Sequence, residues 1–129
     1  MRVASVFRGM EEASTNAELK ACDASCNPYL AVGGLIAAGL DGLERGLEPP
    51  EPVEVDPATI DAHEREARGI VPLPSTQKDA LDALEADDVL TRALGSVLAS
   101  SYLAVRRSEW DAYSAGDESF EQQGHFLKY

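Results

Sequence analysis

Alternating apolar and polar residues near the start of the chain predict two short β-strands. The first covers residues 3–8 and the second residues 15–22, and successive side chains in each change between apolar and polar. Residues 9–13 form a polar connection between them, which favours an antiparallel hairpin. Glu18 and Lys20 lie two residues apart on the second strand, so we expect their side chains to project from the same face.

A long apolar segment follows the hairpin and predicts a helix over residues 27–46. Asn27 suits the N-cap, and Pro28 suits the first helical position, where its missing N–H group costs no hydrogen bond. Residues 29–40 carry no charged side chain, and a helix that is apolar all round is normally covered by other elements. We therefore expect a helix that is buried on nearly every side, with the hairpin packed on it.

Prolines and capping signals alternate after this helix. Residues 47–56 contain several prolines among acidic residues, which predicts an extended linker. Asp56 and Pro57 repeat the cap-then-proline signal and predict a charged surface helix through about Arg68. Ile60 is the main inward contact expected of that helix.

Two shorter helices are predicted next. Ser75 is expected to cap the first, in which Leu81 and Leu84 face inward. Either Asp87 or Asp88 is expected to cap the second.

A final long helix is predicted over residues 96–114. Its apolar residues fall on or near one face, at spacings of three to five: Leu98, Tyr102, Val105, Trp110 and Tyr113. Residues 120–129 are expected to add one or two helical turns. The whole pattern predicts a single, mainly helical α+β domain over residues 1–129, comprising strands in 1–22, the buried helix in 27–46, the linker in 47–56 and a helical part in 57–129.

Composition and charge limit the classes of function. Hydrophobic residues make up 44% of the chain and charged residues 26%, which is ordinary for a globular domain. The formal net charge of -12 disfavours nucleic acid and anionic membrane surfaces as partners, because both attract clustered basic residues. The first residues lack the apolar run of a secretory signal, and two cysteines in that context favour a reducing compartment. A cytoplasmic location is therefore expected.

Several short motifs in the chain occur together in a recognisable order. They are Glu18-Leu19-Lys20, Asp23, Asn27-Pro28-Tyr29-Leu30, Ala37-Ala38-Gly39-Leu40-Asp41-Gly42, Leu73-Pro74-Ser75 and the stretch from Tyr102 to Trp110. This series resembles the C-terminal part of the catalytic domain of the glutamine synthetase family. The resemblance covers almost the whole chain and implies a portion of an ATP-dependent carbon-nitrogen ligase.

The resemblance implies roles for four residues. Glu18 matches a family glutamate that helps to hold a divalent metal, Mg²⁺ or Mn²⁺, whose preferred ligands are oxygen atoms. Lys20 stands at a catalytic position that is usually arginine. Arg2, in a stretch that helps to bind phosphate or substrate, and Arg8 are the cofactor-binding residues that it implies. The simpler alternative for Glu18 is a strand residue that faces solvent or pairs with Lys20.

Lys20 also bears on the substrate that the resemblance implies. Family members use ATP to convert a γ-carboxylate into an acyl phosphate, which ammonia or another amine then attacks. An arginine fork grips a carboxylate through two bonds, whereas lysine is a point charge. We therefore expect a divergent branch that joins a glutamate-like acid to an amine other than ammonia, or one with weakened activity; the family function implied more broadly is the joining of an acid to ammonia or an amine.

The chain matches only a portion of the family's active site. By resemblance, most metal-binding acids and a metal-binding histidine come from strands upstream of the matched region. We therefore expect that the chain by itself binds neither ATP nor metal stably and is inactive. It should form a homo-oligomer or dock onto an upstream glutamine synthetase-like portion, because exposed sheet edges and apolar faces favour association. The alternatives are a non-catalytic helical interaction module and a small acidic metal-binding protein.

The remaining reactive side chains favour structural interpretations. Cys22 and Cys26 are four residues apart, and neither His63 nor His125 lies at a zinc-ligand spacing from them. Buried thiols that pack the turn are therefore expected, while a cysteine-histidine nucleophile pair stays open. Arg106 and Arg107 are interpreted as surface charges, and Trp110 and Tyr113 as core or interface anchors.

Overall fold

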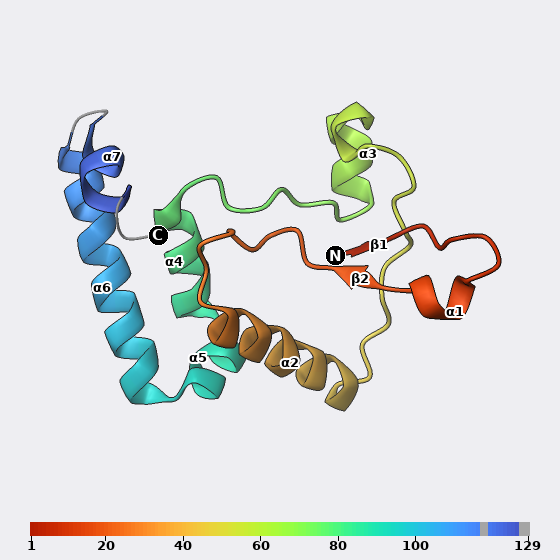
Figure 1. Ribbon diagram of the computed structural model, residues 1–129, viewed down its shortest axis with the longest axis horizontal. Coiled ribbons are helices and arrows are strands. Elements are labelled where there is room, and N and C mark those ends of the chain that lie inside the picture. Colours follow the sequence, from red (N-terminus) through yellow and green to blue (C-terminus); the bar gives the residue numbers. More distant parts are fainter. Residues whose placement is uncertain (117–118, 127–129) are drawn as a thin grey trace. The chain divides into compact units, whose positions relative to one another are not determined.

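The computed structural model describes residues 1–116 and 119–126, and Figure 1 shows the order of its elements. It divides into two compact units, Met1–Ala31 and Val32–Tyr129. The chain is mainly helical and contains a two-stranded antiparallel hairpin, which confirms the expected fold class. The elements are β1 (Arg2–Val3), α1 (Glu11–Ser14), β2 (Ala17–Glu18), α2 (Pro28–Glu44), the 3₁₀ turn η1 (Pro57–Thr59), α3 (Ala62–Ala67), α4 (Gln77–Ala86), α5 (Asp88–Leu94), α6 (Ser96–Ala115) and α7 (Phe120–His125).

The hairpin has a fixed register but is shorter than the sequence predicts. Arg2 pairs with Glu18 and Val3 with Ala17 across antiparallel strands. The ladder extends only as far as the Ala4 N–H group, which donates to the Asn16 carbonyl at 3.3 Å.

Local hydrogen bonds explain why the strands stop early. The Phe7 N–H group donates to the Ser14 hydroxyl at 2.9 Å, and that hydroxyl donates to the Met10 carbonyl at 2.8 Å. The Gly9 N–H group donates to the Glu11 carboxylate at 2.8 Å. Serine and acidic side chains thus satisfy backbone groups that a longer ladder would use. The result is α1, a short helical turn within the segment for which the sequence predicts only a polar connection between the strands.

Helix α2 begins and ends as predicted. The Asn27 side-chain oxygen accepts the N–H groups of Tyr29 and Leu30 at 3.0 and 3.3 Å, so Asn27 is the N-cap. After the last turn, Gly46 adopts a φ of 61°, and the Leu47 N–H group donates back to the carbonyl of Gly42 at 2.9 Å. This left-handed glycine is the usual way to end a helix.

The predicted burial of α2 is wrong for the described chain. None of its 17 residues, all described by the structure, is buried. Tyr29 is 86% exposed, Ile36 56% and Leu43 80%. These three residues are spaced by seven, so they lie along one stripe of the helix. An apolar helix is normally covered, and burial depends on the neighbours available rather than on the helix's own sequence.

The predicted surface helix is split in two. Asp56 caps η1, accepting the Ala58 N–H group at 2.9 Å, and Asp61 caps α3, accepting the Glu64 N–H group at 3.0 Å. Ile60, between them, is extended and 7% exposed, which confirms its inward position. A second capping residue so soon after the first ends one helix and starts another.

Helices α4 and α5 each begin at a capping side chain. Thr76, not the predicted Ser75, caps α4, since its hydroxyl accepts the Asp79 N–H group at 3.1 Å. Asp87 caps α5 by accepting the N–H groups of Val89 and Leu90, both at 2.9 Å, which decides between the two candidate aspartates.

Helices α4, α5 and α6 pack together as the best-covered part of the second unit (Figure 1). Leu81 of α4 is 4% exposed and Ala99 of α6 is 7% exposed. The inward face of α6 is therefore rotated from the predicted one, because Leu98 and Val105 are 43% and 57% exposed. Small Ala99 lets α6 lie close to its neighbours, which periodicity of large side chains cannot indicate.

An ion-pair network joins α4 to α6. The Arg107 guanidinium lies 2.9 Å from an Asp82 carboxylate oxygen and also pairs with Glu85. Lys78 pairs with the other oxygen of Asp82. Arg107 was predicted to be a surface charge. Its side chain is instead partly covered and links two helices through ion pairs.

The last helix that the structure describes is α7, which confirms a helical turn over residues 120–125, while residues 127–129 lie outside the described part. Among the described residues, no helix is both long and apolar enough to cross a membrane.

Candidate functional site

The hairpin brings three of the four predicted site residues together. Because Arg2 and Glu18 are register partners, their side chains emerge at the same position of the sheet. The Glu18 Oε2 atom lies 3.5 Å from the Arg2 Nη1 atom and 3.0 Å from the Lys20 Nζ atom. One carboxylate oxygen is therefore held between two cations.

The two cations change the acidity of Glu18. The close contact with the Lys20 ammonium, together with the charge of Arg2, holds the pKa of Glu18 below its usual range. The Oε2 atom is enclosed, and its contacts with Arg2 and Lys20 are ion pairs. The site therefore keeps an ionised carboxylate on a short sheet, paired with two cations.

Arg8 lies apart from this cluster. It is exposed in the turn before Gly9, whose φ of 82° reverses the chain direction. Among the described residues, no ion pair links Arg8 to Glu18. Its predicted role in cofactor binding remains a prediction.

The residues of this cluster do not by themselves form a divalent metal site. Mg²⁺ and Mn²⁺ require several oxygen ligands around one point. The described residues contain no group of three or more histidine, cysteine, aspartate or glutamate side chains that could hold a metal. The Glu18 carboxylate can supply one or two oxygens, and its nearest described neighbours are positively charged.

The turn after the cluster corrects one prediction. Cys22 and Cys26 are both free and exposed, not buried. The turn is held instead by Asp23, whose Oδ1 atom accepts the Ser25 N–H group at 2.7 Å and the Ser25 hydroxyl at 2.8 Å. Its carbonyl also accepts the Cys26 N–H group at 3.1 Å. Hydrogen bonds of Asp23, rather than packing of the cysteine side chains, therefore hold the turn. Both thiols remain exposed.

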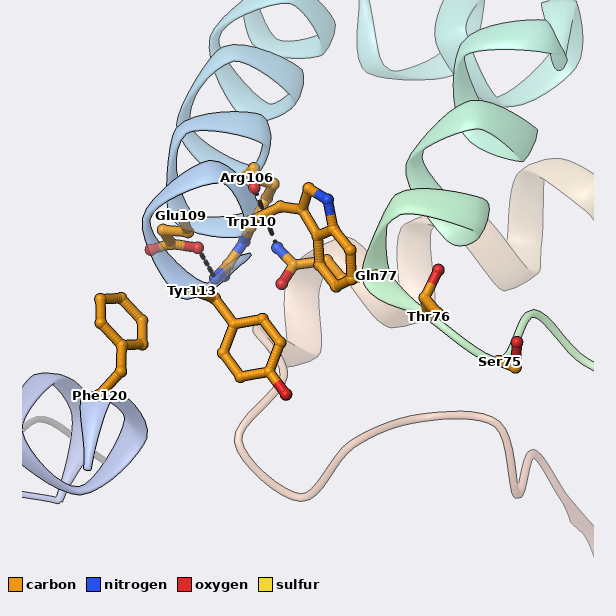
Figure 2. Close-up of a pocket in the computed structure, with 8 residues that line it drawn as sticks. All are labelled: Ser75, Thr76, Gln77, Arg106, Glu109, Trp110, Tyr113 and Phe120. Carbon is orange, nitrogen blue, oxygen red and sulfur yellow. Dashed lines mark hydrogen bonds and ion pairs between the residues drawn. The ribbon is translucent and has the colours of Figure 1, made fainter. Parts of the chain in front are cut away.

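A separate pocket of about 330 Å³ lies in the second unit, and the sequence analysis did not predict it (Figure 2). Its walls come from the start of α4, the second half of α6 and α7. The lining residues are Ser75, Thr76, Gln77, Arg106, Glu109, Trp110, Tyr113 and Phe120.

Aromatic rings and one ion pair organise this pocket. The ring centroids of Trp110 and Tyr113 are 5.6 Å apart, and Phe120 meets Tyr113 edge-on at 6.1 Å. Arg106 pairs with Glu109 at 2.7 Å, and the Gln77 amide donates to the Arg106 carbonyl at 3.1 Å (Figure 2). The spacing of Trp110 and Tyr113 on one helix was the available sequence signal, but Phe120 joins them only through the fold.

Comparison with known proteins places the whole arrangement in a family. A family model described as the glutamine synthetase catalytic domain matches residues 1–124. The chain belongs to the glutamine synthetase family. The match includes the hairpin with Glu18 and Lys20, the Asn27 cap, helices α1 to α6 and all of α7 except His125.

Individual relatives give the same family. The chain is 39% identical over 116 residues to a glutamine synthetase of Methanocaldococcus jannaschii, covering 90% of the chain and 25% of the relative. It is 39% identical over 115 residues to a glutamine synthetase of Thermus thermophilus, covering 89% of the chain and 26% of the relative. A gamma-glutamylpolyamine synthetase of Streptomyces coelicolor is 37% identical over 129 residues, covering 100% of the chain and 28% of the relative. The chain thus spans about a quarter of the length of these relatives.

Proposed function

We propose that this chain is the C-terminal portion of a glutamine synthetase-like, ATP-dependent ligase that joins a glutamate-like acid to ammonia or another amine. The observation that carries the proposal is the ionised Glu18, held by Arg2 and Lys20 on the hairpin of a chain that matches the family's catalytic domain. In the assembled enzyme Glu18 supplies one carboxylate to a divalent metal, Lys20 is the catalytic cation, and Arg2 and Arg8 contact the nucleotide phosphates. The setting we propose is cytoplasmic.

The rest of the active site comes from outside this segment. A single carboxylate cannot surround a divalent metal, and the described residues offer no second cluster. Mg²⁺ or Mn²⁺, when bound, would neutralise charge on the transferring phosphate. We therefore propose that the chain is inactive alone and needs an upstream glutamine synthetase-like portion.

The uncovered face of α2 supports this requirement for a partner. Val32 and Leu40 are each 54% exposed, beside Tyr29, Ile36 and Leu43 on a helix without charge up to Leu40. Exposed apolar surface of this extent marks an interface. We propose that α2 docks onto the upstream portion, or onto a further copy in a homo-oligomer.

The amine is the least defined substrate. Two of the relatives named above are glutamine synthetases, and the third is a gamma-glutamylpolyamine synthetase. The lysine at position 20 provides a point charge instead of a two-bond fork, which fits a branch with altered substrate contacts.

Reconstitution tests the proposal. The chain is mixed with the part of the Streptomyces coelicolor relative that the match leaves uncovered, and ATP-dependent phosphate release is measured with glutamate and either ammonia or a polyamine. We expect turnover from the mixture and none from either part. Glu18→Gln should abolish turnover, whereas Glu12→Gln, an exposed position in α1, should not. Amide formation by the chain alone, or equal activity of both variants, would contradict the proposal.

The docking face has its own test. Ile36→Glu should weaken assembly of the two parts by more than tenfold, because it places a charge in the apolar stripe. Val97→Glu is the control, since Val97 of α6 is 78% exposed and lies outside α2. Sedimentation velocity measures assembly, and circular dichroism checks that both variants keep their helices.

A second candidate function is a non-catalytic helical interaction module. The aromatic pocket formed by Trp110, Tyr113 and Phe120 favours it, because aromatic-lined hollows of about 300–1,000 Å³ commonly bind ligands or side chains. A stable complex without ATP turnover, unchanged by Glu18→Gln, would select this function over the ligase.

A further inference from the structure

The turn between the hairpin and α2 carries two thiols that the proposed ligase chemistry does not use. Both Cys22 and Cys26 are free and exposed, so an oxidant in solution can reach them. They sit at the two ends of a five-residue segment, within a single compact unit. This accessibility distinguishes them from buried structural cysteines, which are inert.

The geometry of the turn keeps the two thiols near each other. The Cys26 N–H group donates to the Asp23 carbonyl at 3.1 Å, which folds the segment back on itself. The Asp23 carboxylate fixes the same turn through Ser25. Local desolvation together with the neighbouring Cys22 raises the pKa of Cys26.

We propose that Cys22 and Cys26 form a reversible disulfide, making this turn a site of thiol oxidation by small-molecule disulfides such as glutathione disulfide. In a reducing compartment, exposed cysteine pairs of this kind form transient bonds that respond to the redox state. The inference stands independently of the ligase proposal, since it needs no other portion of the enzyme.

The exchange proceeds in two steps. The Cys22 thiolate attacks one sulfur of glutathione disulfide, forming a mixed disulfide and releasing one glutathione thiolate. The Cys26 thiol then loses its proton and attacks the Cys22 sulfur. This forms the Cys22–Cys26 bond and releases the second glutathione. The protein loses two electrons and two protons, and one glutathione disulfide becomes two glutathione molecules.

The Cys22–Cys26 disulfide would restrict the turn that joins the hairpin to the start of α2. Lys20 precedes the turn by two residues, and the Asn27 cap follows Cys26 directly. Closing the ring restricts the backbone between the Lys20–Glu18 ion pair and the start of α2. Oxidation therefore acts on the link between the charged cluster and the helix.

Mass spectrometry of the purified chain tests the assignment. The chain is equilibrated in glutathione buffers, quenched with acid and treated with a thiol-alkylating reagent. With glutathione disulfide in excess, we expect most of the wild type to lose the mass of two hydrogen atoms and to resist alkylation at both cysteines. Reduced glutathione should restore alkylation at both.

Single substitutions separate the roles of the two thiols. Cys26→Ser should accumulate a stable glutathione adduct on Cys22, because the resolving thiol is missing. Cys22→Ser should react much more slowly. Two independent glutathione adducts on the wild type, thiols that remain reduced throughout, or disulfide-linked dimers at low protein concentration would each overturn the proposal.

Discussion

The Lys20 ammonium nitrogen lies 3.0 Å from the Oε2 atom of Glu18, the same oxygen that Arg2 approaches from the opposite strand. The hairpin register produces this arrangement, because Arg2 and Glu18 are direct cross-strand partners. A carboxylate with two cations beside it stays ionised in more acidic solution than an isolated one. The contact therefore sets both the charge of the cluster and its response to pH.

Removing Lys20 should raise the pKa of Glu18 towards its ordinary value of 4.5. Lys20→Met removes the ammonium group that lowers the pKa of Glu18 most, while Lys78→Met, which removes a cation of α4, is the control. A carboxyl-carbon NMR titration measures the change. A Glu18 pKa that is unmoved in Lys20→Met would show that the ion pair does not form in solution.

The same lowered pKa predicts how stability depends on pH. A carboxyl group with a lower pKa in the folded state stabilises that state above its unfolded value of 4.5. This contribution disappears as pH falls through the lower, folded pKa. Glu18→Gln should therefore flatten the loss of hairpin stability below pH 4.5, measured by hydrogen exchange of the Ala4 amide, relative to wild type.

Leu81 should be the most sensitive position of the helical unit. It is 4% exposed, and truncation of a buried leucine costs about 2–4 kcal/mol through lost burial and the cavity left behind. Leu81→Ala is compared with Leu73→Ala, since Leu73 is 69% exposed and should change stability by about 0.5 kcal/mol or less. Urea denaturation followed by circular dichroism measures both. Equal losses of unfolding free energy in the two variants would contradict the observed packing of α4.

Two adjacent aspartates should differ in their effect on α5. Asp87 accepts the N–H groups of Val89 and Leu90, so Asp87→Ala should cost about 1 kcal/mol of unfolding free energy. Asp88 is exposed in the first turn and caps neither group, so Asp88→Ala should cost less than about half as much. Thermal unfolding distinguishes them, and the reverse order would place the cap at Asp88.

Substitution by alanine should change the free energy of unfolding in opposite directions at two glycines. Gly95 joins α5 to α6 with a φ of 77°, so Gly95→Ala should destabilise the chain by about 1–3 kcal/mol. Gly39 lies inside α2, and an added methyl group would meet nothing within 4 Å. Gly39→Ala should therefore stabilise the chain by about 0.5–1 kcal/mol. Denaturant titration of each variant checks the sign.

Features set by neighbouring residues could be predicted from the sequence. The Asn27 cap was expected and Asp87 was one of two candidate caps for α5, because a capping side chain needs only the N–H groups two or three residues ahead. The helical ends at Gly46 and Gly95 follow from the same local geometry, and both glycines have a positive φ. The family motifs likewise needed only their order along the chain.

Features set by distant contacts could not be predicted. The exposure of Ile36 and Leu43 depends on which surfaces are available to cover α2, and apolar periodicity cannot supply that. The shortened strands have a local cause instead: Ser14 and Glu11 bind nearby backbone groups, and alternation of apolar and polar residues does not show which backbone groups a side chain will take from the ladder. The pocket needed Phe120 to meet Tyr113 from another helix, which spacing within one helix does not show.

The stripe of Tyr29, Ile36 and Leu43 has a consequence for how any assembly responds to its surroundings. Because no charge interrupts the helix before Asp41, association through this stripe depends on the release of water rather than on ion pairing. Concentrated sodium chloride should leave such a complex intact, whereas cooling weakens it, since apolar burial loses strength at low temperature. Storage on ice is then the condition under which such an assembly should be weakest.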